Sequence, residues 1–577
     1  MMTTDTTGPT FRAFDGEAID NNYCLIATSS KYLYSKTRLS SKECLAFLFN
    51  NLASDEIGVF FGMHYDVVNI LHDLEEEQLD QLNDYNETIY GGYKIVYFPR
   101  KILVIQKGKI QKRFYDVWGF FQSSFESAIK EHLKITDEVI KGGKQSRAIF
   151  KRSQWREIIK YNSRECMYLE QLCRHLAEVT KDFNLKSWHG ASAISSVILA
   201  KLETVKINKS RESELDSESF SLIRAGYYGG RIEAIKLGHL DNCVSYDIVS
   251  AYPSAMLTLP NLTNFKQHTN YIPNRQGYYE IEYSSTLFAS NAPAPFPEHF
   301  GNRLFYPANC STTITHHELE AFYYLCKQHP NLYKKKDVKI IRGITVDNTV
   351  SDLSTTIQEL FNKRKELKAL HDPRQMAYKL ALNSAYGKFA QKVGNPKYSV
   401  YFWAGLITGH CRAQMIRLSA NAINNVVMFA TDSITFNAPV ELAETKNLGG
   451  LELAHKGSVN VLMSGMYKWT DSPAAKVRGF LGLDFEAAYK EVNKKGEYIH
   501  NGRMLVGFNP PKLLRPFRGS IVKYPKRLRL DANIKRDYDT FDFDLTKDFT
   551  DSSPHIRSEA VTPVNYGDNN EPDVLEV

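Results

Sequence analysis

The chain has 577 residues, of which 43% are hydrophobic, and it carries a net charge of +7. This length is too great for one compact core and predicts several domains, and the mild positive charge favours polyanionic partners. A polar start excludes a secretory signal, no apolar run is long enough for a membrane span, and the eight cysteines form no C-x-x-C pair that would indicate a zinc ribbon. We therefore expect a cytoplasmic protein without a membrane partner.

Short apolar strands alternate with helices over about 11–180, which predicts a mixed α and β domain. Residues 203–219 are charged and polar and predict an exposed connection. Strands and helices then mix again, and basic residues dominate 503–530. The sign of the charge reverses further on, so we expect an acidic, disordered tail at 536–577. The polar residues 1–10 are expected to be disordered as well.

The stretch SYDIVSAYPS combines an apolar strand with the start of a helix. Asp247 is expected at the end of this strand, where a carboxylate can hold a cation. Taken alone, Asp247 could equally cap the following helix.

The stretch HDPRQMAYKLALNSAYGKF predicts a helix that carries Lys379, Asn383 and Tyr386 on one face, at i, i+4 and i+7. The helix before it carries Arg364 and Lys368 at i and i+4. Two such helices could clamp the triphosphate of a nucleotide. The alternative is a pair of solvated amphipathic helices.

The stretch VVMFATDSITF predicts a strand, a tight turn and a second strand, with Asp432 at the turn. Asp247 is its expected partner from another strand. Two carboxylates held close together repel each other unless a cation neutralises them. Mg²⁺ suits this arrangement, because it binds a few protein oxygens together with substrate phosphates.

In this order, the patterns D-x-x-S-x-Y-P-S, K-x-x-x-N-S-x-Y-G and T-D-S resemble motifs A, B and C of family B DNA polymerases. GYYGGR is similar to the Y-x-G-G/A element of the protein-primed members from phages, viruses and linear plasmids. The resemblance implies an α+β multidomain fold, with an RNase H-like 3′–5′ exonuclease domain followed by a right-hand polymerase. The implied regions are the exonuclease at 11–200, the palm at 220–260 and 388–480, an insertion that contacts the priming protein at 261–358, the fingers at 359–387 and the thumb at 481–535.

The resemblance also assigns roles to single residues. Asp247 and Asp432 match the catalytic metal-binding pair, with the carbonyl of Ile248 as a further ligand, and Tyr252 matches the steric gate against ribonucleotides. Ala430 stands where the family usually has a first Asp, in D-T-D-S. The implied nucleotide contacts are Lys379, Asn383 and Tyr386, with Arg364 and Lys368 as additional phosphate contacts. The implied DNA contacts are Tyr227, Gly229 and Gly230 on the template, and Tyr467 and Lys468 in SGMYKW, where the family's K-x-Y element appears in reversed order.

Three segments of the N-terminal region are similar to the family's exonuclease motifs. They supply Asp15 and Glu17 in FRAFDGEAID, Asp66 in VFFGMHYDVVNIL, and Tyr161 and Glu165 in KYNSRECMYLEQL. The third motif usually ends in Asp, so Glu165 is longer by one methylene, and Gly62 or Met63 replaces the usual Asn of the second. The alternative for D-x-E is an ordinary turn. Four carboxylates and a Tyr suit two-metal hydrolysis.

We therefore expect a DNA-directed DNA polymerase with proofreading, which replicates a viral or mobile-element genome in the host cytoplasm by protein priming. Its expected ligands are two Mg²⁺ at each site, with Mn²⁺ as a substitute, deoxynucleoside triphosphates, primer-template DNA and a separate terminal protein, and the chain is expected to be a monomer. The short segment between motifs B and C predicts weak strand displacement. Two alternatives stay open: a polymerase with a weakened exonuclease, because of Glu165, and an inactive protein that binds primer-template, because of Ala430.

Overall fold

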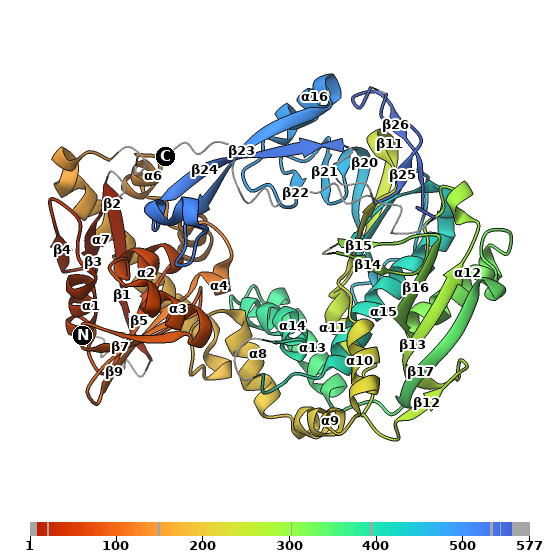
Figure 1. Ribbon diagram of the computed structural model, residues 1–577, viewed down its shortest axis with the longest axis horizontal. Helices are drawn as coiled ribbons and strands as arrows, with labels where there is room; N and C mark the ends of the chain where they lie inside the picture. Colours follow the sequence, from red (N-terminus) through yellow and green to blue (C-terminus); the bar gives the residue numbers. More distant parts are fainter. Residues whose placement is uncertain are drawn as a thin grey trace.

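The computed structural model describes residues 8–19, 22–146, 150–301, 303–392, 396–530, 535–542 and 544–556. In Figure 1 the N-terminal domain and the regions expected to be the fingers, the palm and the thumb follow one another around the middle of the molecule, and these names are kept for the regions below. Among the helices of the described residues, none combines the length and the apolar character that crossing a membrane requires. The expected disorder at 1–10 falls mainly outside the described residues, and β1 begins at Thr10.

A six-stranded mixed sheet forms the centre of the N-terminal domain. Its strands, in spatial order, are β1 (Thr10–Ala13), β5 (Glu56–Phe60), β9 (Ile110–Asp116), β8 (Ile102–Lys107), β7 (Tyr93–Phe98) and β6 (Glu87–Tyr90). Strands β1, β5 and β9 run parallel, and the other neighbours are antiparallel. A smaller antiparallel sheet consists of β2 (Asp15–Ile19), β3 (Asn22–Ala27) and β4 (Tyr32–Tyr34).

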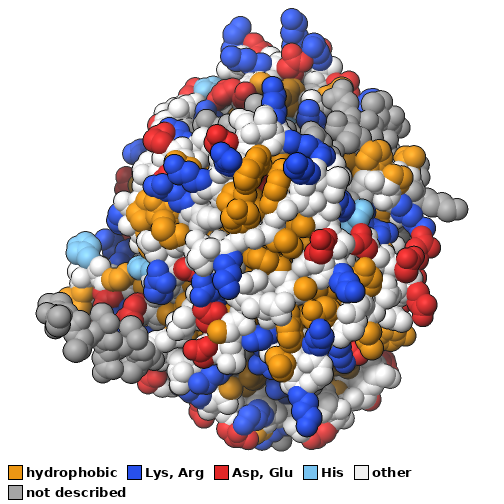
Figure 2. Space-filling model, turned by 90° about the vertical axis from the view of Figure 1, so that its left-hand side faces the viewer, with side chains coloured by type: hydrophobic (Ala, Val, Ile, Leu, Met, Phe, Trp, Pro, Cys, Tyr) orange, Lys and Arg blue, Asp and Glu red, His pale blue; other side chains and the backbone are white. Residues whose placement is uncertain are grey.

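The helices of this domain are α1 (Ser41–Asn50), α2 (His64–Ile70), α3 (Glu76–Tyr85), α4 (Trp118–Phe121), α5 (Phe125–Ala128), α6 (Glu138–Ser146) and α7 (Trp155–Val179). Helix α7 packs against β1 and β2. Its buried side chains recur every three or four residues, so that one face meets the sheets. That face carries Tyr161 and Glu165 among apolar neighbours such as Ile158 and Leu169. Basic and acidic side chains are interspersed on the outer side of this domain (Figure 2).

Helices α8 (Ala191–Ala200), α9 (Glu203–Ser213) and α10 (Ser217–Ala225) lead from this domain to the palm. Residues 203–219 do form a connection of which about half is exposed, but it is helical and has buried anchors that the expectation did not include. Val205 is fully buried, in one core with residues of α10, α11 (Ala251–Met256) and α15 (Tyr401–Ser419). The carboxylate of Glu212 accepts the N–H groups of Tyr401 and Phe402 at 3.0 and 2.6 Å. The polar composition of the segment gave no indication that Val205 and Glu212 would be buried.

The palm is an eight-stranded sheet. Its strands, in spatial order, are β10 (Arg231–Ala234), β18 (Val426–Thr431), β19 (Ser433–Phe436), β11 (Leu237–Ile248), β20 (Leu451–Met463), β21 (Met466–Trp469) and β22 (Lys476–Val477), with β26 (Phe549–Thr550) also paired to β11. Helices α11 (Ala251–Met256) and α15 (Tyr401–Ser419) pack beside it, and α15 is buried along most of its length. The sheet pairs strands that are far apart in sequence: β11 pairs with β19 across about 190 residues and with β26 across about 310.

The insertion has its own four-stranded sheet, in the order β12 (Lys266–His268), β17 (Val338–Asp347), β13 (Arg275–Ser284) and β16 (Asn309–Thr315), with the hairpin β14 (Glu298–Phe300) and β15 (Arg303–Phe305) and the helix α12 (His316–Gln328). The fingers are the paired helices α13 (Leu353–Ala369) and α14 (Gln375–Phe389). The thumb consists of α16 (Phe485–Lys495) and the long hairpin β23 (Glu497–Leu505) and β24 (Ile521–Arg529).

The expectation of a disordered tail at 536–577 is wrong for the part that the structure describes. There β25 (Asp537–Tyr538) pairs with β27 (Ser552–Ser553). Arg536 is fully buried and donates to a carboxylate oxygen of Glu233 at 3.2 Å and to the carbonyl of Ser552 at 3.0 Å. One buried cation thus anchors an otherwise acidic segment to the palm. The rest of the expected tail, 557–577, lies outside the described residues.

Candidate active sites

Asp432 forms a one-residue link between β18 and β19. Its N–H donates to the carbonyl oxygen of Ala430 at 3.0 Å, and Thr431 between them has a φ of +70°. A positive φ is costly for a β-branched residue, and such strain is concentrated at functional turns. The carbonyl of Asp432 accepts the N–H of Ile248 at 2.9 Å. The strained turn is therefore fixed beside the end of β11, which carries Asp247.

Asp247 lies opposite Ser433 of β19 and opposite Glu452 of β20. Residues directly opposite each other on antiparallel strands have neighbouring side chains on one face, so Glu452 adds a charge that the sequence reasoning missed. Burial raises the pKa of Asp247, and the charges of Asp432 and Glu452 raise it further. Burial also raises the pKa of Asp432. Asp247 and Asp432, the palm pair, are thus held where a cation would favour their charged forms.

A cavity of about 510 Å³ contains the palm pair. Ala430 forms part of its wall, so the cavity keeps two expected acids and has a methyl group in place of a third. The cationic and aromatic side chains that complete the wall come from β20 to β22 and the turn beyond them: His455, Tyr467, Trp469, Lys476 and Arg478. No local motif marks His455, Lys476 or Arg478, because only the pairing of the strands brings them to Asp247.

Tyr467 and Lys468 are neighbours on β21 and point to opposite faces. Tyr467 lines the cavity, and burial, together with the charges of Asp247 and Asp432, raises its pKa. The Lys468 ammonium instead pairs with Glu486 of α16 at 2.6 Å. The structure brings only Tyr467 of this pair to the palm pair.

Tyr252, the expected steric gate, projects from α11 and joins the palm to the fingers. Its ring lies 4.5 Å from the ring of Tyr386 between centroids. The hydroxyl of Tyr386 lies 3.4 Å from that of Tyr227. Burial raises the pKa of Tyr252 above its ordinary value, so the ring is a neutral wall at physiological pH. Three expected contacts from separate motifs therefore form one aromatic cluster.

The glycine turn before β10 also reaches this cluster. A Cβ at Gly230 would lie 2.6 Å from Cγ2 of Thr431 and 3.0 Å from the hydroxyl of Tyr252, so only glycine allows the close approach. The fully buried guanidinium of Arg412 donates to the carbonyls of Tyr228 and Gly229 at 2.8 and 2.9 Å. Arg412 is a support that the motifs did not indicate.

The expected nucleotide contacts lie on the exposed sides of the fingers. Lys379 and Asn383 are exposed on α14, one turn apart, and Lys368 is exposed on α13. Arg364 is half-buried; burial lowers its pKa, and the charge of Glu452 opposes that shift. The opposite side of α14, with Ala377 and Ala381, is buried against the N-terminal domain.

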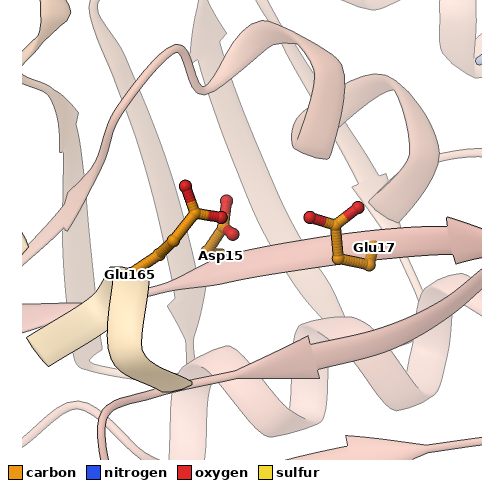
Figure 3. Close-up of side chains that lie close together, drawn as sticks. All are labelled: Asp15, Glu17 and Glu165. Carbon is orange, nitrogen blue, oxygen red and sulfur yellow. The ribbon is translucent and has the colours of Figure 1, made fainter. Parts of the chain in front are cut away.

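The second acidic group lies in the N-terminal domain. Asp15, Glu17 and Glu165 each place a carboxylate oxygen within 4.8 Å of the others. Asp15 and Glu17 come from one side of β2, and Glu165 comes from α7 (Figure 3). Glu17 and Glu165 are buried. These three residues form the N-terminal cluster. Glu165 thus brings its carboxylate close to those of Asp15 and Glu17, although its side chain is one methylene longer than the usual Asp.

Asp66 and Tyr161 lie next to the N-terminal cluster. Burial raises the pKa of Asp66 to about 7, the nearby charge of Glu165 contributes to the rise, and a hydrogen bond from the Tyr23 hydroxyl at 3.0 Å opposes it. Burial and the charges of Glu165 and Glu17 raise the pKa of Tyr161. All five expected residues of this region therefore share one electrostatic environment.

Asn162 and Asp116 also support this region, although no sequence motif indicated them. Nδ2 of Asn162 donates to the Asp15 carboxylate at 2.7 Å. The carboxylate of Asp116 accepts the N–H groups of Gly62 and Met63, both at 2.9 Å. These two bonds fix the start of α2, which carries Asp66. The turn that lacks the family's usual Asn is thus held by a carboxylate from β9.

Both groups of carboxylates fit a divalent cation of the hard, oxygen-preferring kind. The N-terminal cluster offers three carboxylates within reach of one ion. In the palm pair, burial and the neighbouring negative charge disfavour the charged form of Asp247, and a bound cation would restore it. Neither group contains a His or Cys among the expected ligands, which favours Mg²⁺ or Mn²⁺ over zinc.

Comparisons with known proteins agree with this architecture. A family model described as DNA polymerase type B, organellar and viral, matches residues 104–435, which is more than half of the chain. The chain is 26% identical over 523 residues to a DNA polymerase of Acidianus bottle-shaped virus (isolate Italy/Pozzuoli), covering 85% of this chain and 71% of the viral protein.

The fold is similar to that of phi29 DNA polymerase. The structure complexed with primer-template DNA gives a TM-score of 0.61 at 16% identity, with 90% of this chain and 100% of that chain covered. The ternary complex with incoming nucleotide gives 0.58 at 15% identity, with 90% and 99% covered. This likeness confirms the expected fold, an exonuclease domain followed by palm, fingers and thumb. The chain belongs to the organellar and viral type B DNA polymerases.

Proposed function

We propose that the chain extends the 3′-hydroxyl of a DNA primer with deoxynucleoside triphosphates and removes misincorporated 3′ ends in its N-terminal domain. The observation that carries the polymerase assignment is the palm pair. Two carboxylates from different strands share one cavity, and the fingers, with their exposed amide and ammonium groups, pack on the aromatic cluster beside it.

Each part of the polymerase site has a separate task. Lys379, Lys368 and Arg364 bind the phosphates of the incoming nucleotide, since cations on two helices can contact several phosphate oxygens at once. Tyr386 and Asn383 lie against the new base pair. Tyr252 excludes a 2′-hydroxyl by its ring, and Tyr227 with the glycine turn supports the template strand. Tyr467 lines the side of the cavity from which a primer end would approach Asp247.

Asp247 and Asp432 would hold two Mg²⁺, with the Ile248 carbonyl as a further ligand. When bound, the ions supply an activated 3′-hydroxyl and charge stabilisation for the departing pyrophosphate. The chain itself contributes a fixed pair of carboxylates, which the strained turn at Thr431 aligns before substrate arrives.

We propose a working 3′–5′ exonuclease at the N-terminal cluster. Asp15, Glu17, Asp66 and Glu165 would hold its cations, and Tyr161 would orient the attacking water beside Glu165. The support for activity despite the unusual Glu165 is that its carboxylate lies within 4.8 Å of those of Asp15 and Glu17. The alternative of a weakened exonuclease gains no specific support from this arrangement.

The thumb is proposed to grip the duplex backbone. On one face of its hairpin, Lys523, Arg527 and Arg529 alternate with buried or half-buried residues along β24. Arg503 lies directly opposite Lys523, and a like-charged pair across two strands is unfavourable unless a polyanion binds it. DNA binding should therefore weaken steeply with salt.

The biological setting follows from the relatives. The match to a DNA polymerase of Acidianus bottle-shaped virus supports the proposal that this chain replicates a viral or mobile-element genome. Protein priming, with the insertion at 261–358 as the surface for a separate terminal protein, is proposed from the GYYGGR element and from the presence of that insertion between the palm strands. We also propose that the chain is a monomer and that it acts in the cytoplasm of the host cell.

The test is a gel assay of a labelled primer-template with Mg²⁺, run with and without deoxynucleoside triphosphates. We expect extension when nucleotides are present and stepwise trimming of a mismatched 3′ end when they are absent. Binding of primer-template with neither reaction would favour the inactive binding protein. Extension without any trimming would favour the weakened exonuclease.

A further inference from the structure

A cleft of about 1300 Å³ lies at the amino ends of the parallel strands β1, β5 and β9. Its lining includes Thr10 and Glu56, which are the first residues of β1 and β5. Asp15 of the N-terminal cluster instead follows the carboxyl end of β1, and on α7 the lining begins at Arg174, more than two turns beyond Glu165. The cleft is therefore separate from the candidate exonuclease site.

Basic side chains dominate the walls of this cleft. Five basic residues line it, against two acidic ones: Lys112, Arg113, Arg174, Lys181 and Lys186 against Glu56 and Glu178. Both acids already have a partner, since Glu56 pairs with Arg12 at 2.6 Å and Glu178 pairs with Lys181 at 3.4 Å. The other four basic side chains form no ion pair within the part of the chain that the structure describes. Cations gathered without counterions repel one another, and a bound polyanion would relieve that repulsion.

The four unpaired cations come from three different elements. Lys112 and Arg113 lie near the start of β9, Arg174 lies on the exposed side of α7, and Lys186 belongs to the segment 181–188 between α7 and α8. Cations spread along an open cleft match the repeating phosphates of a nucleic-acid strand, whereas a single phosphate needs cations that converge on one point. The volume of the cleft also exceeds the range of about 300–1,000 Å³ that is usual for small-molecule pockets.

Buried aromatic residues form the floor of the cleft. The rings of Phe11 and Trp188 meet edge to face with centroids 4.9 Å apart, and these side chains are 3% and 5% exposed. Tyr115 beside them is 6% exposed. Rings buried to this degree cannot stack on bases, so a strand in the cleft would be held by its phosphates, without a preference for sequence.

The segment 181–188 also connects the cleft with the fingers. The carboxylate of Asp182 accepts a hydrogen bond from the hydroxyl of Tyr378 at 3.1 Å, and the ring of Phe183 lies 5.0 Å from that of Tyr378 between centroids. Tyr378 directly precedes Lys379 on α14. One short segment thus borders the cleft and contacts the helix that carries the expected nucleotide contacts.

We propose that this cleft binds single-stranded DNA through its phosphates. The inference rests on the proposed polymerase function, which supplies DNA next to α14. A DNA molecule that is being copied has two sources of single strand: the template that has not yet been copied, and the strand that is displaced from a downstream duplex. Both offer the same backbone chemistry to the cleft, so the experiment distinguishes them.

The test compares two double variants that lose the same charge. Arg113→Gln with Arg174→Gln removes two unpaired cations of the cleft, and Lys31→Gln with Lys42→Gln removes two exposed cations of the same domain outside it. The Kd of a labelled primer-template is measured in a chelator, so that no metal-dependent trimming alters the DNA. The template overhang is about 2 or about 12 nucleotides long, the longer one being within the usual size range of single-strand sites. A third substrate has a short gap before a downstream duplex, whose displaced strand ends in a flap as long as the longer overhang.

We expect the wild type to bind one of the two longer single strands severalfold more tightly than the short overhang, and the cleft variant to lose this gain. A gain with the overhang identifies the template, and a gain with the flap identifies the displaced strand. The dependence of log Kd on log salt should fall by about 1.4 in the cleft variant, since each phosphate contact on a single strand contributes about 0.7.

The cleft would be overturned by a wild type that shows no gain, by a cleft variant that keeps the gain, or by a control variant that loses it equally. Failure of the wild type to bind even the short-overhang primer-template would overturn the proposed polymerase function, and the cleft with it.

A cross-link tests the location without removing any cation. Ser54 lines the cleft and is exposed, whereas Ser30 is exposed outside it, in the turn between β3 and β4. Ser54→Cys and Ser30→Cys are each labelled with a photoreactive maleimide in a Cys310→Ser background, because the other seven native cysteines are buried. Illumination should join the single strand to position 54 and not to position 30. Equal cross-linking at both positions, or none at position 54, would contradict the site.

Discussion

The palm pair and the N-terminal cluster are both groups of carboxylates, but their surroundings differ. Asp247 and Asp432 are half-buried in a cavity whose wall also carries Lys476 and Arg478. Glu17 and Glu165 are buried beside Asp66, Tyr161 and Asn162, which brings several acids and few cations together. The wall of the palm cavity thus carries cationic side chains of the chain itself, whereas the neighbours described for the N-terminal cluster are a further acid, a phenol and an amide.

The two groups also differ in how they are built. A strained turn and paired strands fix the palm pair, so its geometry depends on the backbone. The N-terminal cluster combines β2 with one side of α7, so its geometry depends on side-chain length. We infer that any substitution in the palm pair abolishes most of the nucleotide incorporation. Substitutions in the N-terminal cluster should instead reduce trimming by different amounts. The stability of the N-terminal domain should also depend more strongly on bound metal than that of the palm.

The largest effect is expected from Asp432→Asn. Removing one charge of the palm pair should lower nucleotide incorporation by at least about 10³-fold, because developing charge loses its fixed stabilisation. Trimming of a mismatched primer, which we propose for the N-terminal cluster, should stay unchanged in the same gel assay. Asp471→Asn, at an exposed acid of the palm, is the control. Incorporation at the wild-type rate would remove Asp432 from the chemistry.

The converse change is Asp15→Ala with Glu17→Ala. Two ligands of the N-terminal cluster are lost, so we expect trimming to fall by about 10²- to 10³-fold while extension continues. The rate of release of the 3′ nucleotide measures this loss. Asp55→Ala, an exposed acid of the same domain, should leave trimming intact. A parallel loss of extension would contradict the separation of the two sites.

Tyr252→Val tests the aromatic wall of the palm. Shortening the side chain opens room for a 2′-hydroxyl, so discrimination against ribonucleotides should fall by about 10²-fold, corresponding to about 2.7 kcal/mol. Single-nucleotide insertion with each sugar gives the ratio. Tyr252→Phe keeps the ring and should keep the discrimination. Unchanged selectivity in Tyr252→Val would exclude the gate.

Glu165→Asp restores the residue that the family usually has and should nevertheless reduce trimming. The shorter side chain withdraws one carboxylate from the N-terminal cluster, and we expect a loss of about tenfold, in the range typical of small changes around a metal. Glu157→Asp on the exposed side of α7 is the control. An increase in trimming would mean that Glu165 weakens this exonuclease.

The smallest effect is on stability. Mg²⁺ that binds the folded N-terminal cluster should raise the unfolding temperature by a few degrees, since ligand at about 100 times its Kd stabilises by about 2.7 kcal/mol. The shift should shrink in Glu17→Gln and persist in Asp247→Asn, where the cluster is intact. Thermal unfolding with Mg²⁺ or with a chelator measures it. A larger dependence on Asp247 than on Glu17 would reverse the comparison.

Local patterns were enough for the elements that carry the expected residues. SYDIVSAYPS does form a strand followed by a helix, and Lys379, Asn383 and Tyr386 do share a side of α14. Composition was misleading at 203–219 and in the tail, because a few buried residues, such as Val205 and Arg536, decide whether a polar segment folds. A count of charges does not reveal which of them find a partner.

The amino-acid sequence by itself determined the catalytic candidates, since residue type and spacing along one strand, turn or helix are local properties. Tertiary structure alone decided that Glu452 lies opposite Asp247 and that Arg412 supports the glycine turn. It also decided that Tyr467 lines the cavity, whereas Lys468 points away from it and pairs with Glu486. It also decided that the thumb reaches α2. These contacts join residues distant in the chain, and they depend on strand register and domain packing, which no short stretch of sequence contains.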